Sequence, residues 1–519
     1  MNGPEVMLRL KAWGAGRPLA RGETKHVPIA PDRDARVLAF VKMGGESAPW
    51  GIAWGSPAGA PAPKLWSVPE ARNRDAVAAM CTAFGRELCA FLLESRFVKT
   101  GWGDGPIPFP QVWLPNPTHL EMLHFVALRY WSKAPGEVGD DAALKTTGRA
   151  ATWLFREGQR PGTPAVLVAT DVLREAFEFP AEEARQGHLG FLLAWLTTPG
   201  GREERLAAAA EAESSPIATA MDPRMEEKKL FPLVKEWNEG APGGKEEAAA
   251  SIRVVLEKEL LRRWGLAARA VAEMRADPRR ENRGLAVLVR SARGALKSAF
   301  VDVEAGLRSG KPVFVPGPET EPTASSAAEE YFRRSAAADE AFSALVGDDG
   351  EMQLEAIGVG DALRGRVVEI RPAGASSGHA PTWVFVTPGQ APTRVREESE
   401  LCDVSLPTRK GVVRLVEPTS GGDTRWEIEM LDLGKSGKEG AVASAGAADR
   451  RVVGTEVTLV RTSDPWLALL PIRRLVEAKA GAGAWLTHGT AGENARKREA
   501  DGVDGVGGVD GGEVGDLDD

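Results

Sequence analysis

The sequence is poor in cysteine and histidine, and it lacks the common motifs that bind nucleotide phosphates. Three cysteines and six histidines occur among 519 residues. No two cysteines form a CxxC pair, and no two histidines have the i, i+4 spacing of a helical zinc site. No GxxxxGK[ST] loop occurs, and no GxGxxG joins a strand to a helix. These absences exclude a disulfide framework, and we assign no catalytic residue, metal or other cofactor.

Long hydrophobic runs are also absent. No stretch approaches the ~20 apolar residues that a transmembrane helix needs, and the N-terminal stretch MNGPEVMLRLKAWGAGRP lacks the apolar segment of a secretory signal. Hydrophobic residues make up 43% of the chain and charged residues 27%, a balance typical of folded domains with buried cores. We therefore expect a cytoplasmic protein of about three or four domains, without membrane contact.

The net charge of −8 is unevenly distributed along the chain. The last 21 residues carry eight acids and no lysine or arginine, so the rest of the chain is close to neutral. Between residues 252 and 311, 14 basic residues face 7 acidic ones. The sequence therefore predicts an acidic tail, which is too poor in apolar residues to fold alone, and a basic patch.

The order of β-type runs and helical patterns predicts an α+β multidomain protein. Strands at 37–43, 50–54 and 64–68 and a helix at 74–95 indicate an N-terminal mixed α/β unit. A long helical pattern from 246 to 307 is interrupted at Asp277-Pro278, because proline cannot donate the hydrogen bond of a helix interior. Six further β-type runs predict a small C-terminal barrel: 363–370, 382–387, 411–416, 426–431, 455–461 and 466–470.

These patterns give the expected domain boundaries. They are 1–135 for the α/β domain, 136–238 for a mainly helical region, 246–311 for a basic helical region, 312–328 for a linker, 329–478 for a helix plus the barrel, and 490–519 for the disordered acidic tail.

Two sets of residues are candidates for contact with nucleic acid. Arg290, Arg293 and Lys297 fall on one face of the second basic helix, where they could hold phosphates without reading a base sequence. Five more arginines extend this patch: Arg262, Arg263, Arg279, Arg280 and Arg283. Trp383 and Trp426 in the predicted barrel are candidates to stack on bases. The alternatives are a solvated face that pairs with nearby glutamates and tryptophans that pack in the core.

The remaining reactive residue types have structural interpretations. Pairs of glutamates occur at 182–183, 203–204 and 226–227, each in a helical context that indicates a solvated face. A metal-dependent site would need acids that converge from several strands. Cys81 and Cys89 follow the apolar positions of a helical pattern and are expected to be small buried side chains.

The C-terminal third resembles the accessory region, stalk helices and β-barrel, of Upf-like superfamily 1 helicases. The stretch from Gly360 to Ile370, GDALRGRVVEI, looks like the first strand of that barrel, and Gly454–Leu459, GTEVTL, looks like a late one. In that family a motor domain follows. Here Ala484–Thr490 stands where its phosphate loop would come and contains no Gly-Lys-Thr, which implies that any motor belongs to another polypeptide.

The N-terminal pattern is similar to the RNase H-like exonuclease domains that precede some of these helicases. Such domains need metal-binding acids on their first strand, and Val37–Met43 has none, which implies an inactive domain. Together the resemblances imply a non-catalytic accessory protein that binds single-stranded DNA or RNA and works with a separately encoded helicase or nuclease. A protein-interaction scaffold and a cryptic metal-dependent nuclease are the alternatives.

Overall fold

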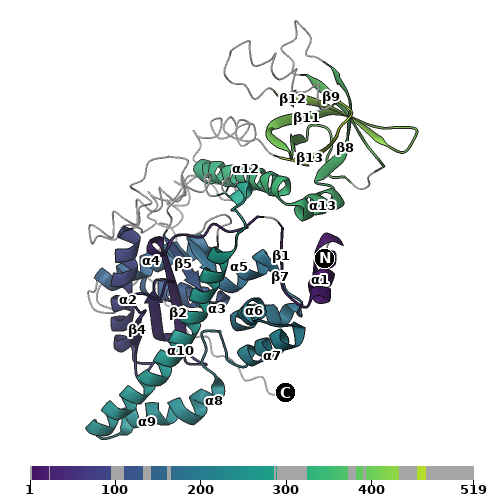
Figure 1. Ribbon diagram of the computed structural model, residues 1–519. Coiled ribbons are helices and arrows are strands. Elements are labelled where there is room, and N and C mark those ends of the chain that lie inside the picture. Colours follow the sequence, from purple (N-terminus) through teal and green to yellow (C-terminus); the bar gives the residue numbers. More distant parts are fainter. Residues whose placement is uncertain are drawn as a thin grey trace, which may run out of the picture. The chain divides into compact units, whose positions relative to one another are not determined.

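The computed structural model describes residues 3–22, 24–94, 110–131, 142–159, 165–285, 288, 324–371, 381–389, 393–431 and 453–462. It confirms an α+β protein with an N-terminal mixed α/β part, a helical middle and a small C-terminal barrel (Figure 1). The β-type run at 466–470, most of the expected second basic helix and linker, and the acidic tail lie outside the described residues.

A five-stranded sheet forms the centre of the α/β part. Its order is β4-β3-β2-β5-β6, with β2 at Ala35–Lys42, β3 at Pro49–Gly55, β4 at Lys64–Ser67, β5 at Gln111–Leu114 and β6 at Val166–Val168. Strands β2, β3 and β4 are antiparallel neighbours, whereas β5 and β6 run parallel to β2. The central strands are mainly apolar because both faces of the sheet are covered, and the two charged residues of β2, Arg36 and Lys42, lie near its ends.

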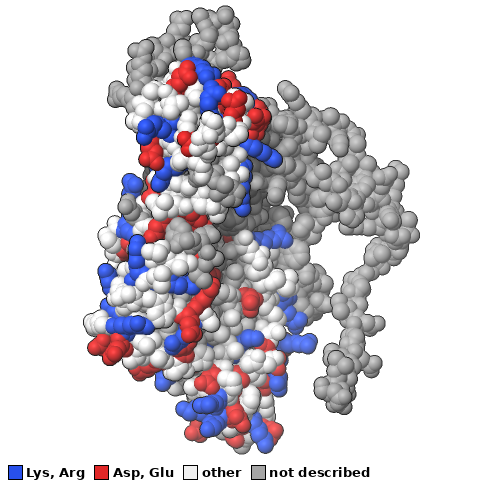
Figure 2. Space-filling view, turned by 90° about the vertical axis from the view of Figure 1, so that its right-hand side faces the viewer, with Lys and Arg blue, Asp and Glu red and all other residues white. Residues whose placement is uncertain are grey.

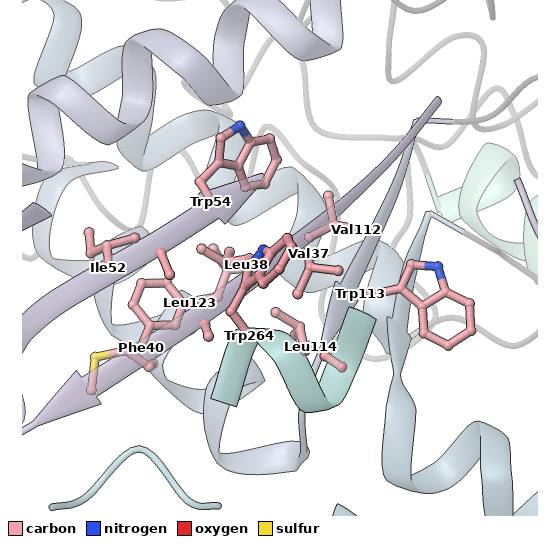
Figure 3. Close-up of a cluster of buried hydrophobic side chains, with 14 of the residues drawn as sticks. Val37, Leu38, Phe40, Ile52, Trp54, Val112, Trp113, Leu114, Leu123 and Trp264 are labelled. Atoms are coloured by element: carbon pink, nitrogen blue, oxygen red, sulfur yellow. The ribbon is translucent and has the colours of Figure 1, made fainter. Parts of the chain in front are cut away.

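Two long helices cover opposite faces of the sheet. Trp54 of β3 packs edge-to-face on Phe84 of α2 (Arg74–Glu94). On the other face lies α10 (Pro242–Ala276), where a Cβ on Gly51 would stand 2.9 Å from Leu260. Alternate residues of β3 therefore face different helices, as strand geometry requires. Figure 3 shows Trp54 and Trp264 on the two sides of the strands.

Helix α2 is long and apolar enough to cross a membrane by length and composition alone. Its apolar residues include Cys81, Phe84, Leu88 and Leu92, each of which is fully buried in the core of the α/β part. The helix is therefore apolar because it packs inside the domain.

Smaller elements surround the sheet. They are α1 (Gly3–Ala15), α3 (Pro117–Trp131), α4 (Ala142–Gly158), α5 (Ala169–Ala176), α6 (Leu189–Thr197), α7 (Arg202–Glu213), α8 (Pro223–Met225), a π-helical turn (Glu226–Leu230) and α9 (Phe231–Glu239). A two-stranded ribbon pairs β1 (Leu19–Ala20) with β7 (Phe177–Glu178). Helix α10 ends at Ala276, directly before Asp277-Pro278, as the sequence predicts.

The C-terminal strands form a closed antiparallel barrel in the order β10-β11-β12-β9-β8-β13. Their bounds are Ala362–Arg371 for β8, Thr382–Thr387 for β9, Glu400–Asp403 for β10, Leu406–Pro418 for β11, Thr424–Leu431 for β12 and Glu456–Arg461 for β13. Strand β10 was not predicted, and its pairing with both β11 and β13 closes the barrel.

Two helices precede the barrel, α12 (Ala324–Asp348) and α13 (Gly350–Gly358). Val346 near the end of α12 and Ala356 of α13 share a buried cluster with Cys402 and Val460 of the barrel strands. The Ser343 hydroxyl donates to the Arg461 carbonyl at 3.0 Å. The end of α12 and α13 are therefore part of the same packed unit as the barrel.

Candidate functional site

The first candidate is the crevice where β2 and β5 diverge. The two strands pair only from Ala35–Gln111 to Val37–Trp113. Further along β2, Lys42 pairs instead with the chain around Ala220, since the Lys42 N–H donates to the Thr219 carbonyl at 2.7 Å. Ligands of sheets with parallel strands bind at the carboxyl ends of strands that diverge in this way. Here residues 216–221, which we call the crevice segment, occupy that position.

His119 of α3 fills the rest of the crevice. Its side chain is fully buried, with Nδ1 3.0 Å from the Phe40 backbone N–H and Nε2 3.1 Å from the Ile217 carbonyl. A backbone N–H can only donate, so Nδ1 accepts and the proton is on Nε2, which donates to Ile217. Burial lowers the pKa of His119 to about 3, and the nearby Arg263 charge adds to this effect. The imidazole is thus a neutral link between β2 and the crevice segment.

Arg263 fixes the crevice segment from the side of α10. Its side chain is fully buried, and it donates through Nε to the Ala218 carbonyl at 2.9 Å and through Nη2 to the Ala220 carbonyl at 3.0 Å. Its Nη1 lies 2.7 Å from Glu259 Oε2. Burial lowers the pKa of the guanidinium to about 10, and Arg262 lowers it further, while Glu259 acts in the opposite direction. Arg262 also pairs with Glu259, and it donates to the Pro216 carbonyl.

Arg262 and Arg263 therefore satisfy internal carbonyls and a carboxylate in this structure, and they do not project as phosphate contacts. No local sequence pattern indicates this role, since the carbonyl partners of the two arginines on the crevice segment are 43 to 46 residues away. The role of His119 is likewise not visible in a local pattern, since its partners Phe40 and Ile217 lie 79 and 98 residues away in the chain.

The other predicted phosphate contacts differ in accessibility. Arg279 pairs with Asp277 and donates to the Arg21 carbonyl at 2.9 Å, so its side chain is only 10% exposed. Arg283 is half-exposed and lies 2.8 Å from Asp348. Arg280 is the most exposed, at 78%, with Asp348 3.8 Å away.

The three residues on which the predicted phosphate face depends, Arg290, Arg293 and Lys297, lie outside the described residues.

The two candidate stacking residues lie in the barrel core. Trp383 and Trp426 are 0% and 1% exposed. The Trp426 Nε1–H donates to the Thr387 hydroxyl at 3.1 Å, and the Arg409 guanidinium lies 5.2 Å from the centroid of the Trp383 ring. Neither indole presents a face on which a base could stack, so the structure places both in the packing role.

The outer surface of the barrel carries many arginines, most of them in ion pairs. Arg371 pairs with Glu369 and Glu427, and Arg414 pairs with Glu398 and Glu429. On the face shown in Figure 2, basic and acidic side chains are interspersed.

Two arginines of the barrel differ from the rest. Arg366 and Arg396 are exposed, and neither has a carboxylate within 4.0 Å among the residues that the structure describes.

The glutamate pairs have local structural roles. Glu226 accepts from the Gly44 N–H at 2.6 Å, and Glu204 accepts from the Gly201 N–H at 3.0 Å, which caps α7. Glu183 lies 3.7 Å from Arg174. Within the described ranges, no three His, Cys, Asp or Glu side chains are grouped so that they could hold a metal ion.

Comparison with known proteins adds no relative: no family model, curated protein or solved structure matches the chain.

Proposed function

We propose that this chain is a non-catalytic, cytoplasmic nucleic-acid-binding accessory protein that works with a separately encoded helicase or nuclease. One observation carries the proposal. A sheet of three antiparallel and two parallel strands, with the strand order of RNase H-like domains, occurs in one chain with a closed six-stranded barrel. This combination is the one that the sequence resemblances imply.

The crevice supports a binding role over a catalytic one. In an RNase H-like exonuclease, acids on the first strand would meet metal ions at the carboxyl edge of the sheet. In this chain β2 carries no acid, and His119 and the crevice segment occupy the edge. The domain would then contribute shape and surface to an assembly, and the partner would contribute the chemistry.

The surface that contacts nucleic acid would combine two sources of positive charge. Arg366 and Arg396 offer exposed guanidiniums on the barrel, and Arg280 offers one after α10. Arg290, Arg293 and Lys297 would extend this surface along the chain. These side chains would contact phosphates, so we expect single-stranded DNA or RNA to bind with little base specificity and a strong dependence on salt.

The test is fluorescence anisotropy of the full-length protein with labelled single-stranded DNA, single-stranded RNA and duplex DNA, each titrated with salt. Replacement of Arg290, Arg293 and Lys297 by glutamate should weaken binding. If three phosphate contacts are lost from a single strand, the slope of log K against log salt should fall by about 2.

The matched control replaces Arg86, Arg224 and Lys229, which are exposed on α2, α8 and the π-helical turn outside the basic patch, by glutamate and so changes the net charge equally. Equal affinities and slopes for the two triple variants would refute the assignment of the phosphate face.

A second candidate function, a protein-interaction scaffold, is favoured by α1. Met7 and Leu10 are 54% and 60% exposed, and Val6 and Trp13 lie on the same side of the helix. An exposed apolar helix face of this kind is typical of a protein-binding surface. This function predicts no affinity for any oligonucleotide and a partner that co-purifies with the wild type.

The scaffold function has its own test in the same helix. Replacement of Met7 and Leu10 by glutamate should release the partner. Replacement of Val254, which is 66% exposed on α10, should not. A partner retained by the α1 variant would contradict the scaffold function.

A further inference from the structure

A polar cavity of about 330 Å³ lies between α1, α5 and the 3-10 turn Glu183–Gly187. Three arginines and four acidic side chains line it. The volume lies at the lower end of the range of small-molecule sites. Charges of both signs in a small concave space indicate a ligand that carries both signs itself.

A buried carboxylate orients the basic wall. Glu178 of β7 has a fully buried side chain, and it pairs with Arg9 Nε at 3.0 Å and with Arg21. Because a buried carboxylate is strongly stabilised by such pairs, Glu178 fixes the position of both guanidiniums. Arg21 Nε is buried and has no hydrogen-bond partner among the described residues. The Arg21 side chain as a whole is 29% exposed and lines the cavity, so its accessible part is open to a ligand.

Two carboxylates one helical turn apart on α5 supply the acidic wall. Asp171 is half-buried, and burial raises its pKa. The pKa of Glu175 is also raised, first by desolvation of its carboxylate and then by the charge of Asp171. Arg174 lies between them in sequence, and its guanidinium is 3.7 Å from Glu183. The charge of Arg174 acts on both carboxylates and that of Arg21 on Glu175, but among the described residues neither carboxylate forms an ion pair within 4.0 Å. An ammonium group placed between them would stabilise both.

We propose that this cavity binds a small zwitterion of the α-amino-acid class, whose carboxylate contacts Arg21 and Arg174 and whose ammonium group contacts Asp171 and Glu175. With Glu178, five carboxylates face three guanidiniums, so an amino acid with a second cationic group binds most tightly. The site shares no residue with the surfaces proposed for nucleic acid and does not depend on that function.

Isothermal titration calorimetry of the full-length protein with L-arginine tests the proposal. Two analogues each lack one charge: agmatine has no carboxylate, and Nα-acetyl-L-arginine has no ammonium group. L-Arginine should bind about tenfold more tightly than either analogue, since one charge-assisted hydrogen bond is lost in each case. L-Glutamate should bind more weakly than L-arginine.

Three results would overturn the proposal. If agmatine bound as tightly as L-arginine, the cavity would be a simple cation site. Inorganic phosphate that binds more tightly than arginine would indicate an anion site. An absence of heat with all of these probes at millimolar concentration would mean that the cavity takes no ligand of this class.

Variants locate the site on the protein. Asp171→Asn and Arg174→Gln each remove one charge with little change in shape, and each should weaken arginine binding about tenfold. Arg86→Gln, at an exposed position on α2, is the matched control and should bind as the wild type does. Wild-type affinity in both cavity variants, with unchanged circular dichroism, would place any binding elsewhere and refute the assignment.

Discussion

The buried neutral His119 predicts a loss of stability in mild acid. In the folded chain its pKa is about 3, because burial disfavours the charged ring, whereas the ordinary value is 6.5. Between these values the unfolded chain binds a proton that the folded chain does not bind. The free energy of unfolding therefore falls as the pH decreases below 6.5, and it continues to fall until about pH 3.

The magnitude follows from the two pKa values. Each unit of pKa difference corresponds to about 1.4 kcal/mol. At pH 5 the unfolded histidine is almost fully protonated and the folded one is neutral, so His119 lowers the free energy of unfolding by about 2 kcal/mol relative to pH 8. Protonation would also place a second N–H opposite the Phe40 N–H, where no acceptor exists.

The assay compares the wild type with His119→Gln by urea unfolding at pH 8 and pH 5. Glutamine cannot be protonated in this range, although it packs less well and should be less stable at pH 8. The deficit of the variant should shrink by about 2 kcal/mol at pH 5, because only the wild type loses the histidine contribution. A deficit that is equal at both pH values would refute the buried neutral imidazole. A histidine NMR signal from residue 119 that titrates near pH 6.5 would refute it as well.

Three further predictions concern buried side chains. Arg263→Met should destabilise the fold by about 3–5 kcal/mol in urea unfolding, since it leaves the buried carbonyls of Ala218 and Ala220 without their donor and leaves Glu259 paired with Arg262 alone. Arg253→Met on the exposed face of α10 should change the free energy of unfolding by less than about 0.5 kcal/mol. Trp426→Ala should cost about 3–5 kcal/mol in the unfolding of the barrel, and a cost near zero would contradict its place in the core. Burial raises the pKa of Cys81 to about 12, so its thiol should react with Ellman's reagent at pH 8 only when the protein unfolds, and rapid labelling of the native chain would contradict this.

Periodicity predicted most of the described elements. The strands at 35–42, 49–55 and 64–67 and the helix at 74–94 lie within two residues of the expected ranges. These segments are strongly patterned because they fill a two-sided core. The short strand β10 (Glu400–Asp403) was missed, since four residues with two acids give no alternation that a pattern can detect. Its place is set by its partners β11 and β13, which only the closed barrel brings together.

Charge patterning predicted less of the site, because it counts basic residues and not their partners. Arg262 and Arg263 extended the basic patch in the sequence, yet both point at the crevice segment and share Glu259. The cavity also could not be predicted from the sequence. Its walls come from α1, α5 and a turn that starts at Glu183, and no local spacing relates these segments. Such sites depend on tertiary contacts between distant parts of the chain.

Because the crevice is filled, acidic residues added to β2 would not be enough to create a metal-binding catalytic centre there. A two-metal centre needs carboxylate oxygens that converge from several strands on a shared cavity. The polar atoms at this edge already have partners, since the His119 ring joins Phe40 to Ile217 and Arg263 holds the carbonyls of the crevice segment. An aspartate in place of Phe40 would lie beside a neutral imidazole and would lack space for a hydrated ion. The crevice segment would have to leave before any metal could enter, which is why we propose binding rather than hydrolysis for this domain.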